Sequence, residues 1–318
     1  YKKNIKLTNT IDWFYSYRGI LIVGIIIFII SSFVLITMVP ATIDLYVFPQ
    51  LGRIIYVFGY SILGNTVWTG RIIQLIFGIA SCYFIYLTMD LKFDRQTSLL
   101  AAFIYLLVPI SFYFRQTGNY ASGTLFLLIL ISYWFIRYEI HNQSEDLLVA
   151  VYLVGVGYNY KRVIIYMIIV FWVYWGFKSI PLIFKKLKLE INKKLQFTWV
   201  ALIPIVPAYI TDRMFSERIV GFRISRLVDF DDLSLMFRAM PNEVTIAIQI
   251  FFVLGIFLCF IKKYYKLFTF LIIWFSTYYV MFTMWYNLSN PRYLFYFIPP
   301  VVMIASIEIG RASCRERV

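Results

Sequence analysis

The feature that most constrains this chain is its succession of long apolar blocks, separated by short charged connections. The blocks lie at residues 19–39, 70–89, 98–114, 120–136, 147–159, 163–177, 197–211, 243–261, 267–285 and 293–307. Most of them approach the length that a helix needs to cross a bilayer, and 61% of the 318 residues are hydrophobic. Because lipid admits backbone only as helices or closed barrels, we predict an all-α polytopic transmembrane protein with about ten spans.

The domain organisation is predicted to be simple. No connection between the apolar blocks is longer than the polar run at residues 212–243, so we expect one transmembrane domain over residues 1–307, truncated at both ends. The last residues, "EIGRASCRERV", can be back-translated into a widely used sequencing adapter. We therefore expect residues 308–318 to be a sequencing artefact.

The distribution of basic residues predicts an orientation. Lys2, Lys3, Lys6 and Arg18 precede the first block, which favours a cytoplasmic amino terminus in the plasma or inner membrane. The connections at 90–97, 137–146, 178–196 and 262–266 then also face the cytoplasm. Lysine dominates on that side and arginine on the other. Orientation requires only positive charge, whereas the planar guanidinium suits carboxylates and phosphates, so we predict an anion-binding outer face. Pairing with lipid head groups or local acids is the alternative.

Several classes of chemistry lack the residues that they need. The chain has one histidine and three cysteines, and these form no zinc-binding pattern. It also contains no phosphate-binding loop and no dinucleotide fingerprint. Zinc, redox and nucleotide-driven mechanisms are therefore disfavoured, as is a nucleic-acid partner.

The first predicted outer loop carries a single acid, Asp44. Residues 51–63 in this loop form an amphipathic piece too short to span, so we predict a helix lying on the membrane surface. Asp44 could act as a general base or as a ligand of a divalent metal, and it could equally cap a helix. No other cofactor is indicated.

Three phrases occur in an order that resembles a known family. They are "YSILGNTVWTGRI" before the second block, the stretch from "DRQTSLLAAF" to "YWFIRY" at residues 94–138, and "SNPRYLFYFIPPVVMIA" at 289–305. In this order they are similar to phrases of the GT-C type membrane glycosyltransferases, which include protein O-mannosyltransferases and lipid A aminoarabinose transferases. The short polar gap "RQTGNY" lies within the second phrase.

The resemblance implies transfer of a sugar from a polyprenyl-phosphate donor to a hydroxyl of a glycan, lipid or protein at the outer membrane face. It implies Asp44 as the base or metal ligand. The residues expected to hold the donor phosphate are Arg115, Lys161, Arg162 and Arg292. Those expected near the sugar or the acceptor are Tyr46, Gln116, Asn119, Tyr120, Asp212 and Tyr293. The chain departs from the family pattern at Thr117, where relatives carry a glutamate, and at Asp44, which stands without the usual second acid.

Two other functions fit parts of the sequence. A multispan polysaccharide polymerase or ligase also joins lipid-linked glycans at the outer face, but it would use a pyrophosphate-linked oligosaccharide. A flippase or transporter of lipid-linked glycan would carry charged residues at the middle of the bilayer. The phrases at 94–138 favour the transferase.

Overall fold

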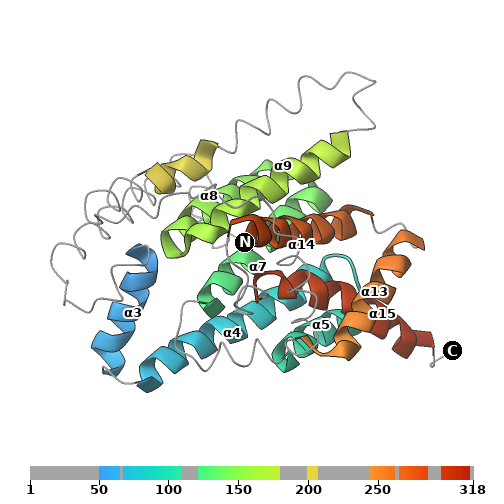
Figure 1. Cartoon of the computed structure of the whole chain (residues 1–318), viewed down its shortest axis with the longest axis horizontal. Helices are drawn as coiled ribbons and strands as arrows, with labels where there is room; N and C mark the ends of the chain where they lie inside the picture. The colour runs from blue at the N-terminus through green and yellow to red at the C-terminus, as the bar shows by residue number, and fades with distance from the viewer. Residues whose placement is uncertain are drawn as a thin grey trace, which may run out of the picture.

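The computed structural model describes residues 50–64, 67–108, 121–179, 199–206, 244–261, 265–285 and 295–315. Regular structure in these residues is helical throughout, as the apolar blocks predict. The helices are α3 (Gln50–Leu63), α4 (Val67–Asp90), α5 (Arg95–Leu107), α7 (Ala121–His141), α8 (Ser144–Tyr160), α9 (Tyr166–Ser179), α13 (Ile246–Ile261), α14 (Tyr265–Trp285) and α15 (Ile298–Arg315). Short 3₁₀ turns occur at η2 (Arg162–Ile165) and η4 (Trp199–Ala201). Figure 1 shows α3 and α4 at one side of the bundle and α13 and α15 at the other.

The helix boundaries differ from the predicted blocks in informative places. Helix α3 confirms the helix predicted at residues 51–63. Helix α7 continues to His141, beyond the predicted end at residue 136, and so contains charged residues that had been expected in a loop. Two described helices, Trp68–Asp90 and Ala121–His141, are long and apolar enough to cross a membrane by length and composition. The number of spans remains a prediction, and the block at 19–39 lies outside the described residues.

A tight connection joins α7 to α8. Asn142 adopts the left-handed conformation, with φ of 57°, and its N–H donates to the carbonyl of Tyr138 at 2.7 Å. Asparagine tolerates this conformation better than most residues, so it ends the helix here. Helix α8 then begins at Ser144, and Glu145 and Asp146 in its first turn complement the helix dipole. The two helices therefore form an antiparallel hairpin.

An ion pair reinforces this hairpin. The Nε atom of Arg137 lies 3.2 Å from Oδ2 of Asp146, close enough for an ion pair, although the two groups are not oriented as a hydrogen bond. Burial raises the pKa of the Asp146 carboxyl, and the positive charge of Arg137 opposes that rise. The charges that had been assigned to a loop thus pack inside the hairpin.

Aromatic stacking joins α7, α9 and α14 in the core. The ring of the fully buried Phe135 stacks on Phe171, with centroids 4.1 Å apart, and on Phe270 at 4.9 Å. In lipid the hydrophobic effect does not drive helices together, so close packing of this kind has to supply the association energy.

Small residues allow other helices to approach closely. A Cβ at Gly255 of α13 would meet the backbone carbonyl of Ile304 in α15. A Cβ at Gly155 of α8 would likewise meet the carbonyl of Ala201. Helix contacts through glycine are characteristic of membrane bundles.

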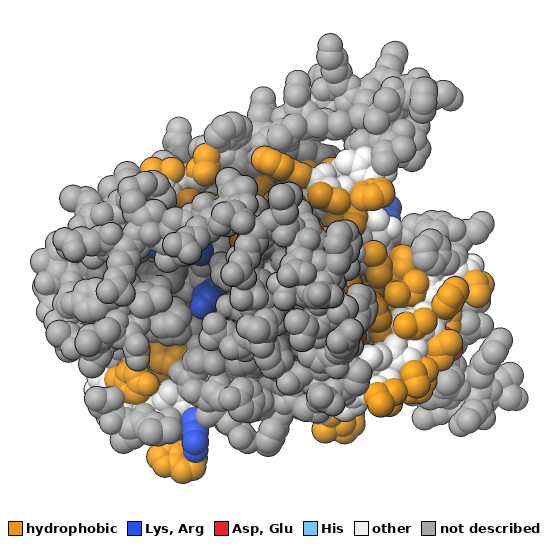
Figure 2. Space-filling model, in the orientation of Figure 1, with side chains coloured by type: hydrophobic (Ala, Val, Ile, Leu, Met, Phe, Trp, Pro, Cys, Tyr) orange, Lys and Arg blue, Asp and Glu red, His pale blue; other side chains and the backbone are white. Residues whose placement is uncertain are grey.

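The outward faces of the bundle are apolar. Exposed residues at three- and four-residue spacing run along α4 and α13, and Figure 2 shows hydrophobic side chains along the edge where α13 lies. They are Trp68, Ile72, Leu75, Ile76, Ile79 and Tyr83 on α4, and Ile246, Ile250, Val253, Leu254, Phe257 and Ile261 on α13. Such faces suit contact with lipid.

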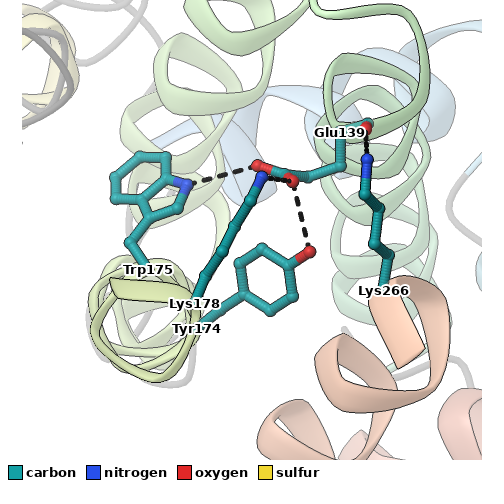
Figure 3. A network of polar contacts seen from close by, with 5 residues as sticks. All are labelled: Glu139, Tyr174, Trp175, Lys178 and Lys266. Carbon is teal, nitrogen blue, oxygen red and sulfur yellow. Dashed lines mark hydrogen bonds and ion pairs between the residues drawn. The ribbon is translucent and has the colours of Figure 1, made fainter. Parts of the chain in front are cut away.

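A buried carboxylate connects three helices at one end of the bundle. Glu139 of α7 accepts hydrogen bonds from the Tyr174 hydroxyl at 3.2 Å and the Trp175 indole at 3.4 Å, both on α9. Lys178 of α9 lies 2.5 Å from the same carboxylate, and Lys266 of α14 donates to the Glu139 backbone carbonyl at 3.3 Å. Figure 3 shows these groups converging on Glu139. A carboxylate this deeply buried requires such partners.

We expect Lys178→Met to lower thermal stability more than Glu139→Gln. The Glu139 side chain is only 5% exposed, so removing the lysine leaves a buried negative charge, whereas the Lys178 side chain is 41% exposed and can turn toward water. The loss should be about 1–3 kcal/mol for Lys178→Met. The unfolding midpoint in detergent measures it, with Lys92→Met as the surface-charge control. Equal losses for the two variants would contradict this account of the network.

Helix α5 begins with a side-chain cap. Asp94 accepts from the backbone N–H groups of Gln96 and Thr97 at 3.0 and 3.2 Å, and from the Thr97 hydroxyl at 2.7 Å. The hydrogen bond from the Thr97 side chain is the main reason that the pKa of Asp94 lies below its ordinary value of 3.8. The cap satisfies donors that the first turn of a helix leaves unpaired.

Asp94→Ala should cost about 1 kcal/mol of stability at neutral pH. Because the folded-state pKa is lowered, the ionised cap stabilises the fold above pH 3.8 and loses this effect as the pH falls through the folded-state value. Unfolding curves of the two proteins at neutral and acidic pH should therefore converge in acid. A stability difference that does not change with pH would show that the charge on the cap is irrelevant.

Candidate functional site

Two of the predicted site residues lie in the part of the chain that the structure describes. Lys161 and Arg162 occupy the connection between α8 and α9. The other predicted residues lie outside the described residues: Asp44, Tyr46, Arg115, Gln116, Asn119, Tyr120, Asp212, Arg292 and Tyr293. The site is therefore built outward from the α8–α9 connection.

The chain turns sharply at Lys161. This residue is extended, with φ of −153° and ψ of 122°, and its N–H donates to the Gly157 carbonyl at 2.8 Å. Its own carbonyl accepts from Ile164 at 3.1 Å, which starts the 3₁₀ turn η2. Lys161 is half-buried and Arg162 is exposed. Two adjacent cations are thus presented at the end of α8.

Buried contacts hold this turn in place. A Cβ at Gly157 would meet the side chain of Ile164, so glycine permits the turn to fold back onto α8. The hydroxyl of Tyr278 in α14 donates to the Val163 carbonyl at 3.1 Å, and both residues are buried. The turn that carries the cations is therefore fixed to a neighbouring helix.

The first turn of α7 lies against the end of α8. A Cβ at Gly123 would overlap the hydroxyl of Tyr160, the residue directly before Lys161. The Tyr160 ring also packs edge-on against Phe77 of α4, with centroids 5.9 Å apart. In the sequence, residues 115–120 come immediately before α7. The residue at which this segment joins α7, which we call its attachment point, thus lies beside the turn that carries Lys161 and Arg162.

The stretch at residues 199–206 reaches the same end of α8. The side-chain amide of Asn159 donates to the Pro204 carbonyl at 2.8 Å and to the Gly155 carbonyl at 3.0 Å. This stretch precedes Asp212 in the sequence. A second attachment point therefore lies within two residues of Lys161.

The residues before α15 join this end of the bundle as well. The Tyr296 ring stacks on Phe282 of α14 with centroids 5.0 Å apart, and Phe282 packs edge-on against Tyr166 at 6.4 Å. Tyr166 directly follows η2, while Tyr296 follows Arg292 and Tyr293 by only a few residues. A third attachment point therefore lies beside the turn.

Sequence reasoning missed the residues that organise this end. Asn159, Tyr160 and Tyr278 all lie inside or beside predicted spans, where they read as part of an apolar block. A polar side chain inside an apolar block needs a buried partner, and this requirement was the only sequence signal that could have identified them. Among the described residues no group of three His, Cys, Asp or Glu side chains is arranged to hold a metal.

Comparisons with known proteins identify the family of the chain. A family model described as dolichyl-phosphate-mannose-protein mannosyltransferase matches residues 49–210, which include α3 to α9, Lys161 and Arg162. The chain is thus a membrane glycosyltransferase-type protein of the GT-C class. It belongs to the dolichyl-phosphate-mannose-protein mannosyltransferase family, because the match covers half of the chain.

A curated relative points in the same direction. The protein called "Putative mannosyltransferase YkcB", from Bacillus subtilis (strain 168), is 28% identical over 108 residues. That match covers 34% of this chain and 15% of the relative, so the chain aligns with a small part of that protein. No solved structure matches the chain.

Tyr278→Phe should loosen the cation-bearing turn. Losing the hydroxyl leaves the buried Val163 carbonyl without this donor, which should cost about 1–2 kcal/mol. Hydrogen exchange should rise in peptides covering residues 161–166. Tyr152→Phe is the matched control, because the Tyr152 hydroxyl makes no hydrogen bond to the described residues. If both variants behave alike, the Tyr278 bond does not hold the turn.

Proposed function

We propose that this protein transfers a sugar from a polyprenyl-phosphate donor to a hydroxyl of a glycan, lipid or protein at the outer face of the membrane. The observation that carries the proposal is the gathering of three attachment points around Lys161 and Arg162. The stretches carrying Arg115, Asp212 and Arg292 all enter or leave the described residues beside this turn.

The charges at the turn suit the leaving group of such a reaction. The acceptor oxygen forms a bond to the anomeric carbon while the bond from that carbon to the phosphate oxygen breaks, and polyprenyl phosphate departs with both bonding electrons. Fixed cations stabilise the negative charge that develops on the phosphate. Lysine offers a compact charge and arginine a planar fork for phosphate oxygens.

The acceptor hydroxyl has to lose a proton, and Asp44 is the proposed base. It precedes α3 by six positions in the sequence, and α3 packs against both α4 and α8. Asp212 is the alternative base, because its segment follows the stretch that contacts Asn159. We also propose that a divalent metal, if one participates, binds at Asp44.

Mannose is the proposed sugar and a polyprenyl phosphate the proposed carrier. The description of the family names dolichyl-phosphate mannose, and the name of the Bacillus relative specifies mannosyl transfer. Both descriptions belong to those proteins, and they favour a monophosphate-linked monosaccharide over the pyrophosphate-linked donor of a polymerase.

The opposite end of α8 supports the proposed orientation. Lys178 and Lys266, both predicted to be cytoplasmic, meet at Glu139 near the start of α8, whereas Lys161 follows its end. At 1.5 Å per residue the 17 residues of α8 separate these groups by roughly 25 Å. That distance approaches the thickness of the hydrocarbon core.

The positions of the buried charged side chains favour the transferase over a transporter. Among the described residues, the buried charged side chains are Glu139 and Asp146, and each lies near an end of its helix. A transporter would place such groups at mid-depth.

The proposal is tested by donor binding and transfer with the purified protein in lipid nanodiscs. We expect polyprenyl-phosphate mannose to bind and to release polyprenyl phosphate when acceptor is present. Lys161→Met and Arg162→Met should each weaken donor binding about ten-fold or more, as for lost charge-assisted hydrogen bonds. Lys92→Met, an exposed charge in the α4–α5 connection, should leave binding unchanged.

Two further results would count against the proposal. Binding of a pyrophosphate-linked oligosaccharide in preference to the monophosphate donor would indicate a polymerase. Asp44→Asn should abolish transfer while donor binding persists, and a variant that still transfers mannose would remove Asp44 from the role of base.

A further inference from the structure

A buried glutamine of α4 contacts the first turn of α7, next to the proposed donor site. The Oε1 atom of Gln74 accepts a hydrogen bond from the backbone N–H of Ser122 at 3.0 Å. Both residues are almost fully buried, with Gln74 at 0% and Ser122 at 1% exposure. The backbone N–H can only donate, which identifies the oxygen side of the amide.

This hydrogen bond acts as a helix cap supplied by another helix. Ser122 is the second residue of α7, so its N–H is one of those that a helix cannot satisfy internally. In a bilayer no water is available to replace a missing partner. The contact with Gln74 therefore holds the first turn of α7 at a defined position along α4.

The position of this turn matters for the proposed site. Gly123, the next residue, fits directly against the hydroxyl of Tyr160, and Tyr160 is followed by Lys161. Residues 115–120, which include the predicted donor-binding Arg115, precede α7 in the sequence. A displacement of the first turn would move the attachment of that segment relative to the two cations.

The unpaired polar atoms of Gln74 and Ser122 indicate that these residues are not chosen for stability alone. The Gln74 amide nitrogen and the Ser122 hydroxyl are buried and have no hydrogen-bond partner among the described residues. Three other small polar side chains of these helices bond to carbonyls one turn away. They are Ser81 and Thr88 in α4 and Ser132 in α7, at 2.8, 2.7 and 2.8 Å. A leucine at position 74 would avoid burying an unpaired amide nitrogen, which costs about 1–3 kcal/mol, but it would also remove the acceptor of the Ser122 N–H.

We propose that Gln74 is a positioning residue of the donor site, which acts through the N–H of Ser122 to hold the first turn of α7 against Tyr160 and Lys161. This inference rests on the proposed function. The inference adds Gln74, a residue of α4, to the donor site. Gln74 is uncharged and lies outside the phrases that resemble the family, so the sequence does not indicate this role.

The test compares three variants in nanodiscs with polyprenyl-phosphate mannose as the probe. Gln74→Leu removes the acceptor, and Gln74→Glu retains an acceptor oxygen at the same reach as the neutral acid, the form that burial favours. Thr88→Val removes a buried hydroxyl of α4 that bonds within its own helix. Gln74→Leu should raise the donor Kd about ten-fold, as for loss of about 1.4 kcal/mol, while the other two variants stay within about two-fold of the wild type. The KM for the acceptor should not change.

Hydrogen exchange gives a second readout that does not require the donor. Peptides covering the first turn of α7 should exchange about ten-fold faster in Gln74→Leu, but not in Gln74→Glu or Thr88→Val. If the wild type does not bind the probe, the proposed function fails, and the exchange result still decides whether Gln74 caps α7. If the wild type binds, equal donor affinities for Gln74→Leu and Thr88→Val overturn the inference. Unchanged exchange in Gln74→Leu overturns it in either case.

Discussion

The packing of α7 against its neighbours is the constraint on which the rest of the described structure depends. The ring of Phe135 stacks between α9 and α14, Ser122 is held by α4, and Glu139 collects donors from α9 and lysine contacts from α9 and α14. Lipid is as apolar as the side chains that face it, so helix association depends on close packing and on polar contacts that have no alternative partner. Helix α7 has contacts of both kinds along its length.

The two ends of α7 and α8 carry different chemistry. At one end a carboxylate is buried among two lysines, a tyrosine and a tryptophan, which serves stability because every donor is directed at Glu139 (Figure 3). At the other end Lys161 and Arg162 follow α8 with Arg162 exposed, while the neighbouring chain segments attach nearby. A site that binds an anionic lipid head has to remain accessible, whereas a structural ion pair does not. This contrast favours the Lys161 end as the location of the proposed donor site.

The sequence offered candidate site residues but not the contacts that support them. Lys161 and Arg162 could be named because they are cations between two apolar blocks, and their role in binding the donor stays a prediction. Tyr278 and Gln74 could not be assigned a role, since each lies within an apolar block and acts on a residue far away in the sequence: Tyr278 on Val163, and Gln74 on Ser122. Glu139 was placed in a connecting loop, because its burial depends on donors from α9 that no local pattern reveals.

By itself the sequence determined that the described chain is helical, that α3 is a short amphipathic helix, and that the protein resembles a GT-C type glycosyltransferase. Those properties follow from apolar block length, spacing and the order of local phrases, which are all local or additive along the chain. Only the tertiary structure decided where α7 ends, which carboxylates are buried, and which chain segments meet at Lys161. These depend on contacts between helices, where a hydroxyl, an amide or the absence of a Cβ matters only once its partner is in place.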